Sequence, residues 1–410
     1  MSVDSPRLQA EIEELAAISS APAPAVTRVL FSDEDVRARK WLAEKFAAEG
    51  LLVRQDAAGN LFARWPGSSP ELKPVATGSH TDAIPNAGRY DGVVGVLGAL
   101  EAFRSLRHEG FQPRRTLEIL MFTAEEPTRF GLGCLGSRLL SGALEPTRAL
   151  ELRDAEGNTF EELRRHAGCE GDVESVRLDA GAYHAFVELH IEQGPLLERE
   201  GIDIGAVEKI AAPAAFRVTI EGEGGHAGAV LMPERRDAAL AAAEIALAVE
   251  RAAIDSESED TVATTGVFRI EPGAINSVPS RAIVEIDLRD TRQDVRDQAE
   301  AQIREAISTI VDRRGVTCTF EVINSDPPAT CDPALVDAIC AAAETCGCSV
   351  RRMISRAYHD SLFMARVCPT AMIFIPCRNG WSHRPDEFAT ADAIGKGVAV
   401  LASVLRRLAE

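Results

Sequence analysis

The pattern of apolar and polar positions changes period several times along the first third of the chain. Apolar residues at helical spacing predict helices, whereas short continuous apolar runs predict buried strands. The segments expected in this region are a helix at 35–49, a hairpin at 53–65, a strand that ends at His80, a helix at 92–108 and a strand at 117–123. Strands that alternate with helices indicate an α/β fold with a mixed, mostly parallel sheet, whose ligand sites gather at the carboxyl ends of the strands.

A second pattern occupies residues 210–326, where the order of elements is βαββαβ. These elements are expected at 216–220, 236–251, 261–270, 282–288, 295–311 and 316–322. This order is typical of a ferredoxin-like sandwich. The helices and the strand after Pro327-Pro328 fit the first sheet better than they fit a third domain. We therefore predict one α/β domain formed by residues 1–209 and 327–410, and an inserted domain at 210–326.

Charge and composition narrow the choice of partners. The 410 residues include 44 Lys and Arg against 63 Asp and Glu, so 44 − 63 gives a net charge of −19. Because no basic block is longer than two residues, we expect no binding to nucleic acid or to a membrane surface. The acidic N-terminus and the lack of an 18-residue apolar run predict a cytoplasmic protein. The nine cysteines are odd in number and mostly in apolar contexts, which indicates free thiols.

Acids and histidines stand at the ends of the predicted strands. His80 and Asp82 follow one strand, and Asp91 comes directly before a helix. Glu125 and Glu126 follow the strand at 117–123, and adjacent residues that leave a strand point in different directions. One of these carboxylates can therefore bind an ion while the other handles a proton. The alternatives are a capped turn around His80 and a solvated acidic loop.

Two further segments add candidate ligands. Residues 187–195 alternate, so that Glu188, His190 and Glu192 share one face of a strand. Two acids and a histidine on one face are costly unless they meet solvent or a cation, and an exposed edge strand is the simpler alternative. His383 follows the strand expected at 371–375.

These side chains could together hold two divalent ions, with one carboxylate as a bridge. The candidate ligands are His80, Asp91, Glu126, His190 and His383. Two neighbouring ions can share a water molecule and lower its pKa, and Glu125 would then be the general base.

Eight separate stretches resemble one family of enzymes. They are GSHTDAIPNAGRYDGVVGVLGALEA, FTAEEPTRFGLGCLGSRLL, ELHIEQGP, GEGGHAGAVLMPERRDAALAAAE, PGAINSVPS, EIDLRD, SRAYHDS and IPCRNGWSHRPDE. They are similar to the allantoate, ureidoglycolate and N-carbamoyl-L-amino-acid amidohydrolases of the two-metal aminoacylase and carboxypeptidase-G-like superfamily. The resemblance extends from about residue 25 to the C-terminus.

The resemblance implies a role for each candidate in a catalytic, metal-binding domain. His80, Asp91 and His190 would hold one ion, while Asp91, Glu126 and His383 would hold the other, with Asp91 as the bridge. Asp82 would orient His80, and Glu125 would be the base. The family uses zinc or manganese, so we expect two Mn²⁺ or Zn²⁺ ions per subunit.

The resemblance also implies that the inserted domain is a dimerisation lid. His226 and Asn276 would reach the active site of the partner subunit in a homodimer, where His226 would stabilise an oxyanion. Arg289 would bind the substrate carboxylate, and Gln193 and His359 would contact the substrate. Without the resemblance, His226 would be placed on a surface loop, and Arg289 in an ion pair with Asp287 or Asp290.

One departure points to a branch of the family. Carbamoylases and many allantoate enzymes carry a Gly-Ala-Gly stretch before the His-Asp pair, whereas this chain has bulkier residues at 355–361. That version resembles the ureidoglycolate branch, and a tight pocket suits a small anionic ureido acid. We expect hydrolysis of ureidoglycolate or allantoate in purine catabolism, with release of ammonia and carbon dioxide. The alternatives are an N-carbamoyl-L-amino-acid hydrolase, an aminoacylase-like peptidase, or a binding homologue that has lost catalysis.

Overall fold

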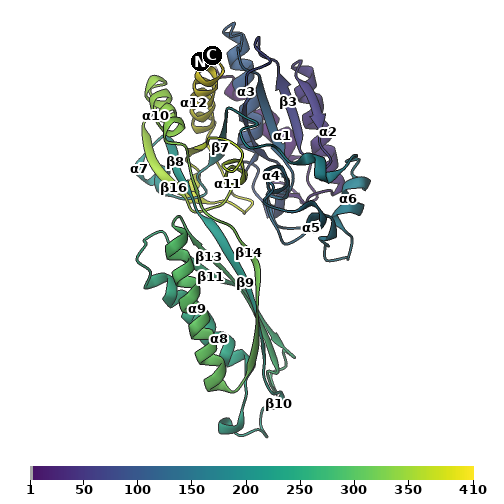
Figure 1. Ribbon diagram of the computed structural model, residues 1–410, viewed down its shortest axis with the longest axis vertical. Helices are drawn as coiled ribbons and strands as arrows, with labels where there is room; N and C mark the ends of the chain where they lie inside the picture. The colour runs from purple at the N-terminus through teal and green to yellow at the C-terminus, as the bar shows by residue number, and fades with distance from the viewer. Residues whose placement is uncertain (1–2) are drawn as a thin grey trace. The chain divides into compact units, whose positions relative to one another are not determined.

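The computed structural model describes residues 3–410, which form two compact units (Figure 1). The first, here called the main unit, comprises residues 3–208, Thr330–Ser355 and His359–Glu410. The second, called the inserted unit, comprises Lys209–Ala329 and Arg356–Tyr358. The segment Arg356–Tyr358 therefore belongs to the inserted unit by its contacts, although it is distant from the rest of that unit in the sequence.

A mixed sheet forms the centre of the main unit, with the strand order β15-β8-β17-β7-β4-β6-β3-β2 and with β16 paired to β8. The strands are β2 (Leu52–Gln55), β3 (Leu61–Trp65), β4 (Val75–His80), β6 (Leu117–Phe122), β7 (Ala185–Ile191), β8 (Ile204–Ile210), β15 (Ala329–Thr330), β16 (Val350–Ser355) and β17 (Thr370–Ile375). A separate pair joins β1 (Val26–Arg28) to β5 (Ala83–Ala87).

The sheet is less parallel than the sequence pattern predicts. The four central strands β17, β7, β4 and β6 pair in parallel. The flanking pairs β17/β8, β3/β6 and β2/β3 are antiparallel. The tight turn between β2 and β3 forces antiparallel pairing, because a parallel partner needs a longer crossover connection. The fold is α/β and mixed, as predicted, but "mostly parallel" holds for the centre alone.

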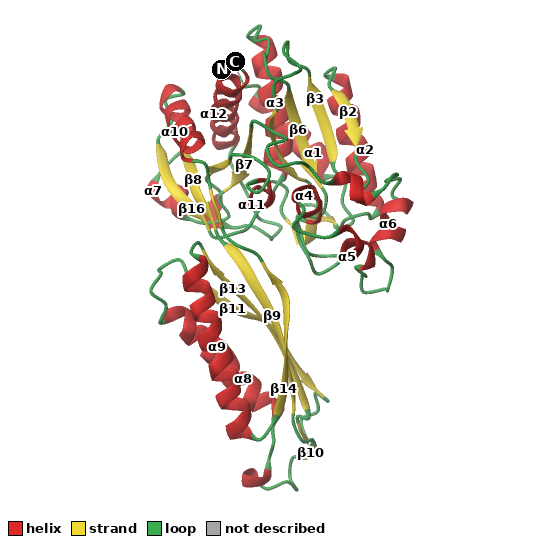
Figure 2. Ribbon diagram, viewed as in Figure 1, coloured by secondary structure: helices red, strands yellow, loops and turns green. Residues whose placement is uncertain are grey.

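Helices cover both faces of this sheet (Figure 2). Helices α1, α3, α10 and α12 pack together on one face, while α4 and α11 pack together on the other. The helices of the main unit are α1 (Ser5–Ala16), α2 (Asp33–Ala48), α3 (Val93–His108), α4 (Leu135–Ser141), α5 (Pro146–Glu151), α6 (Phe160–His166), α7 (Leu196–Glu200), α10 (Pro333–Thr345), α11 (Asp360–Met364) and α12 (Ala391–Ala409). Every residue of β4, β6, β7 and β17 is consequently buried.

The carboxyl ends of the four central strands lie at one edge of the sheet, because these strands are parallel. Past β6, β7 and β17, the chain turns at non-glycine residues with positive φ, namely Ala124 (53°), Gln193 (55°) and His383 (59°). Such left-handed backbone is uncommon for residues with a Cβ and is held in place by the surrounding structure. These turns direct the residues of the candidate site.

The inserted unit has its own antiparallel sheet, with the strand order β11-β13-β9-β14. Its elements are β9 (Ala212–Glu221), β10 (Gly225–His226), α8 (Ala238–Ile254), β11 (Val262–Glu271), β12 (Ser277–Val278), β13 (Arg281–Asp290), α9 (Gln293–Arg314) and β14 (Thr317–Ser325). Helices α8 and α9 cover one face of the sheet (Figure 2). Buried and half-buried residues alternate along β13, so one face forms the core and the other is more open.

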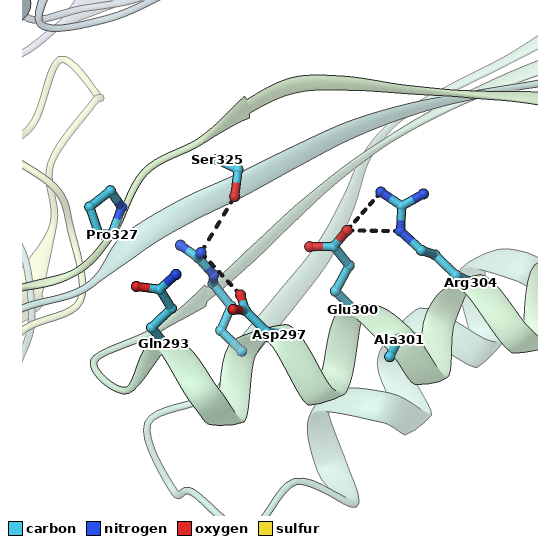
Figure 3. A pocket seen from close by; sticks show the side chains of 8 residues that line it. Gln293, Asp297, Glu300, Ala301, Arg304, Ser325 and Pro327 are labelled. Atoms are coloured by element: carbon cyan, nitrogen blue, oxygen red, sulfur yellow. Dashed lines mark hydrogen bonds and ion pairs between the residues drawn. The ribbon is translucent and has the colours of Figure 1, made fainter. Parts of the chain in front are cut away.

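A groove runs between α9 and the end of β14 in the inserted unit (Figure 3). Buried Arg296 donates to the backbone oxygen of Ala212 (3.3 Å) and to that of Asp326, so it joins the start of β9 to the chain beyond β14. Arg304 donates to Glu300 (2.8 Å). Because its charged side chains pair with one another, we assign the groove a structural role.

All nine cysteines are free thiols, as predicted. Among residues 3–410, no helix combines the length and the apolar character that a membrane crossing requires.

Candidate active site

Asp91 lies at the centre of the candidate site, between two groups of side chains. Its Oδ1 atom is 3.4 Å from His80 Nε2 and 3.2 Å from His190 Nε2. Its Oδ2 atom is 3.5 Å from His383 Nε2, which in turn is 3.3 Å from Glu126 Oε1. In each of the trios His80/Asp91/His190 and Asp91/Glu126/His383, the potential ligand atoms lie within 4.8 Å of one another. The structure thus brings together all five predicted metal ligands.

Local sequence explains how these residues meet. His80 is the last residue of β4, and His190 is the second-last residue of β7. Both therefore lie at the carboxyl ends of these parallel strands. Gly92 follows Asp91 with φ of 65°, and a Cβ at this position would lie 2.4 Å from His80 Nε2. Only glycine therefore lets the chain pass this close to His80 while it directs Asp91 at both histidines.

Asp82 fixes the two glutamates more directly than it fixes His80. Its carboxylate accepts hydrogen bonds from the backbone N–H groups of Glu125 (3.2 Å) and Glu126 (3.0 Å). His80 Nδ1 is 3.1 Å from the backbone oxygen of Asp82 and 3.5 Å from its Oδ1 atom. Asp82 is therefore placed to orient His80, chiefly through its backbone, and also to position Glu125 and Glu126.

The pKa values of two carboxyl groups in the site, those of Glu125 and Asp91, are shifted in opposite directions. Burial raises the pKa of Glu125 well above its usual range, and the charge of Glu126 adds to this rise against the opposing effect of His80. Burial also opposes ionisation of Asp91, but hydrogen bonds from His190 and His80 hold its pKa well below the usual range. Neighbouring groups with divergent pKa values are typical of acid–base pairs in active sites.

The donor atoms fit divalent cations. Imidazole nitrogens and carboxylate oxygens without a thiolate suit Zn²⁺ or Mn²⁺. Asp91, Glu125 and Glu126 are all largely buried, and buried acids in such proximity need positive charge nearby. The two trios share Asp91. Each trio could therefore hold one cation, with Asp91 as a ligand of both.

Gln193 and His359, the predicted substrate contacts in the main unit, also border this cluster. Gln193 Nε2 donates to Asp91 Oδ2 (2.6 Å), whereas Gln193 Oε1 is buried without a hydrogen-bond partner. The ring of His359 packs edge-to-face on His190, with centroids 4.5 Å apart. The unsatisfied oxygen of Gln193 is therefore an acceptor beside Asp91 that a substrate N–H group could use.

The exposed-edge alternative for residues 187–195 is wrong. Strand β7 is central and fully buried, so it is not an exposed edge. Glu188 accepts hydrogen bonds from Ser79 and Ser361, and Glu192 accepts from the backbone N–H groups that begin α7. Hydroxyl and N–H donors satisfy these acids, in place of water or a cation. Glu188 and His359 also lie near His190, but His190 already faces Asp91 and the backbone oxygen of Ile191 (2.9 Å), which argues against a third cation there.

His226 and Asn276 come together within the inserted unit. Strand β10 pairs with β12, so that His226 is opposite Ser277, and the N–H of Ala227 donates to the backbone oxygen of Asn276 (2.9 Å). His226 is exposed.

Arg289 stands elsewhere in the inserted unit, near the end of β13. Its guanidinium donates to both carboxylate oxygens of Asp287 (2.7 and 2.9 Å) and lies 5.5 Å from the ring centroid of Tyr358. The ion pair named above as the alternative for Arg289 is therefore present, and a substrate carboxylate would have to share this guanidinium with Asp287.

Two site residues were missed by the sequence reasoning. Glu387 accepts hydrogen bonds from the backbone N–H groups of Tyr90 (2.8 Å) and Asp91 (3.1 Å), and Ser382 donates to Glu387 (2.9 Å) and to Asp91 Oδ2. Burial and the charge of Asp91 raise the pKa of Glu387 to about 7. Ser382 and Glu387 lie on either side of His383 and Pro385 in one short motif. This proximity to a predicted ligand was the feature of the sequence that could have identified them.

Known proteins resemble this chain over its full length. The model of Peptidase family M20/M25/M40 matches residues 76–407. A ureidoglycolate hydrolase of Arabidopsis thaliana is 53% identical over 415 residues, covering 100% of this chain and 87% of that protein. An N-carbamoyl-L-amino acid amidohydrolase of Geobacillus stearothermophilus is 37% identical over 405 residues, covering 98% of each. The crystal structure of AtUAH in complex with (S)-hydroxyglycine has a TM-score of 0.93 at 52% sequence identity, covering 100% of this chain and 98% of that one. The chain therefore belongs to peptidase family M20/M25/M40 and is an amidohydrolase.

Proposed function

We propose that this enzyme hydrolyses the ureido C–N bond of a small ureido acid, with ureidoglycolate as the preferred substrate. The observation that carries the proposal is that two trios of potential ligands share Asp91, with Glu125 beside them. Two divalent cations, Mn²⁺ or Zn²⁺, would be held by these trios, and when bound they would supply the positive charge that polarises a carbonyl and lowers the pKa of water. The similarity to a ureidoglycolate hydrolase selects the substrate class.

Glu125 is the proposed general base and then the general acid. Its carboxylate lies 3.8 Å from His80 Nε2, at the edge of the ligand cluster. It accepts a proton from the attacking water and returns it to the departing nitrogen, which leaves as ammonia. The carbamate that remains loses carbon dioxide. From ureidoglycolate this sequence leaves hydroxyglycine, and AtUAH was crystallised with (S)-hydroxyglycine.

The substrate contacts follow from the chemistry of each side chain. Gln193 Oε1, which is buried and lacks a partner, can accept from a ureido N–H group. Arg289 presents a planar fork suited to a carboxylate, and His226 can donate to the oxyanion that develops during attack. His359 packs on His190 and would border the ureido group.

The geometry of β13 supports a homodimer. Arg289 is eight residues from Arg281 along this strand, which corresponds to about 26 Å at about 3.3 Å per residue. His226 and Asn276 lie beside β12, which leads into the Arg281 end of the strand. A small ureido acid cannot span that distance. One inserted unit therefore cannot supply both Arg289 and His226 to the same substrate molecule, and we assign His226 and Asn276 to the partner's active site.

An apolar surface of the inserted unit fits such a dimer. Along α8, Leu240, Leu247 and Ile254 are 42%, 65% and 66% exposed, and their seven-residue spacing puts them on one helix face. Strand β11 beside this helix is the edge of its sheet. We propose that the inserted unit is a ferredoxin-like lid domain that dimerises through α8 and β11.

A substrate panel tests the proposal. The purified chain, stripped of metal and then loaded with Mn²⁺ or with Zn²⁺, would be assayed for release of ammonia from ureidoglycolate, allantoate and N-carbamoyl-L-amino acids, and for cleavage of N-acetyl amino acids. We expect the highest kcat/KM with ureidoglycolate and no turnover without added metal.

The same panel separates the alternatives. A higher kcat/KM on N-carbamoyl amino acids would favour an L-carbamoylase, which the 37% identical relative makes the second candidate. Preference for N-acetyl amino acids would indicate an aminoacylase. Tight binding of ureidoglycolate without any ammonia release would indicate a binding homologue.

A further inference from the structure

A buried glutamate, two residues from His190 in the sequence, joins three elements of the main unit next to the candidate site. Glu188 on β7 is fully buried. Its Oε1 atom accepts a hydrogen bond from Ser79 Oγ (2.6 Å), at the end of β4. Its Oε2 atom accepts from Ser361 Oγ (2.5 Å) and from the backbone N–H of Ser361 (3.2 Å), in the first turn of α11. Three donors thus converge on one carboxylate, and no water is needed to satisfy it.

Each element joined by Glu188 carries a residue of the site. Ser79 directly precedes His80, and Glu188 itself is two residues from His190, both of which are proposed ligands of one cation. Ser361 is two residues beyond His359, the proposed substrate contact. The rings of His190 and His359 also touch edge-to-face. A displacement of the Glu188 side chain would therefore disturb proposed cation ligands and a proposed substrate contact at the same time.

We propose that Glu188 is a positioning residue that holds the cation ligands His80 and His190 in register with the substrate contact His359. It does not touch the substrate and transfers no proton. It acts because two strands and a short helix share one carboxylate, which accepts hydrogen bonds from residues 109 and 173 positions away in the sequence. Hydrogen bonds to a charged acceptor are stronger than neutral ones and more directional than apolar packing. Partners that orient the ligands of a metal typically change metal affinity or activity about 10–100-fold when they are replaced.

The two arms of the network should have separable effects. Ser79→Ala removes the donor next to His80 and should weaken Mn²⁺ binding by about tenfold or more, with a smaller change in KM at saturating Mn²⁺. Ser361→Ala removes the donor next to His359 and should raise KM for ureidoglycolate by about tenfold, with Mn²⁺ affinity near wild type. Glu188→Ala should show both defects, and Glu188→Gln, which keeps the shape and one acceptor oxygen, should recover part of each.

Glu118→Gln provides a matched control. Glu118 is also fully buried in this sheet, where it accepts from Tyr183 (2.6 Å) and Arg64 (2.9 Å). It lies near the amino end of β6, away from the edge that holds the site. Its replacement removes a buried charge from the same sheet, so we expect a lower Tm with unchanged Mn²⁺ affinity and KM.

The experiment measures Mn²⁺ affinity of the metal-free chain by calorimetry, kcat and KM of the Mn²⁺-loaded enzyme, and Tm for each variant. Wild-type Mn²⁺ affinity for Ser79→Ala together with wild-type KM for Ser361→Ala would overturn the proposal, as would Glu188 variants that differ from Glu118→Gln in neither property. If Glu188→Ala fails to fold, the two serine variants decide the question.

The inference rests on the proposed cation site and substrate, but the two can fail separately. Calorimetry with Mn²⁺ requires no substrate. If the wild-type chain binds Mn²⁺ and cleaves no ureido acid, the proposed substrate is wrong, while the metal titrations of Ser79→Ala and Glu188→Gln still decide the role of Glu188.

Discussion

The two units of this enzyme use their sheets in different ways. In the main unit, β6 is buried at all six positions, because helices cover both faces. In the inserted unit, β13 alternates between half-buried and buried residues, because helices cover one face. In a sheet covered on both faces, groups that must reach a ligand are confined to the strand ends, where their side chains converge. A sheet with one open face can carry such groups along its whole length.

This difference explains where the candidate residues meet. The proposed cation ligands come from strand ends of the main unit and from the loops beside them. His226 and Arg289 come from opposite ends of the strands in the inserted unit, so they cannot meet within one copy of it. The main unit therefore brings its candidate residues together within one chain, whereas the proposed role of His226 requires a second copy of the inserted unit.

The largest effect is expected at Glu125. Glu125→Gln keeps the size of the side chain but removes the base, so kcat should fall by about 10²–10⁴-fold while the content of bound cations stays at the wild-type value. Turnover assays with elemental analysis of the loaded enzyme would measure both. Glu151→Gln, at an exposed position in α5, is the control and should be fully active. A Glu125→Gln enzyme with near wild-type kcat would remove Glu125 from its proposed role.

A somewhat smaller loss is expected at His226. His226→Ala removes one donor to the oxyanion and should lower kcat by about 10²–10³-fold. If His226 acts in the partner's site, mixing this variant with Glu125→Gln should produce heterodimers with one intact site, and activity should return. Action within its own chain predicts no recovery, since neither site of the heterodimer would then be intact.

The apolar face of α8 offers the next test. Leu247→Asp places a charge on this 65% exposed position, so sedimentation should show monomers with little change in Tm. Because a monomer would lack both His226 and Asn276 of the partner, its activity should fall at least as far as that of His226→Ala. Leu52→Asp, at a 62% exposed leucine of the main unit, is the matched control and should stay dimeric. A dimeric Leu247→Asp protein would place the interface elsewhere.

The smallest effects concern stability. Leu120→Ala in β6 removes a fully buried side chain and should lower the free energy of unfolding by about 2–5 kcal/mol. Leu247→Ala, measured at concentrations where the chain is monomeric, should change it by about 0.5 kcal/mol or less. Chemical denaturation gives both values. Equal losses would mean that α8 is covered within a single copy.

Sequence reasoning located most of the principal elements but missed α1 and several short ones. The helix predicted at 92–108 corresponds to α3, and the strand predicted at 117–123 to β6. Helices α4, α5 and α6 were not predicted, since six or seven residues are too few to show a helical period. Parallel pairing was overestimated, because the pattern of a buried strand does not reveal the direction of its neighbours.

The sequence by itself determined which functional side chains are available and which of them follow predicted strands. Apolar runs followed by His80, Glu125 and Glu126 define strand ends that carry ligands and a base, because the periodicity of a strand is set by its own residues. The tertiary structure alone decided that the two oxygens of Asp91 face different ligand groups and that serines satisfy Glu188. These choices depend on packing between segments about 290 residues apart, such as Asp91 and His383, and local patterning carries no record of such contacts.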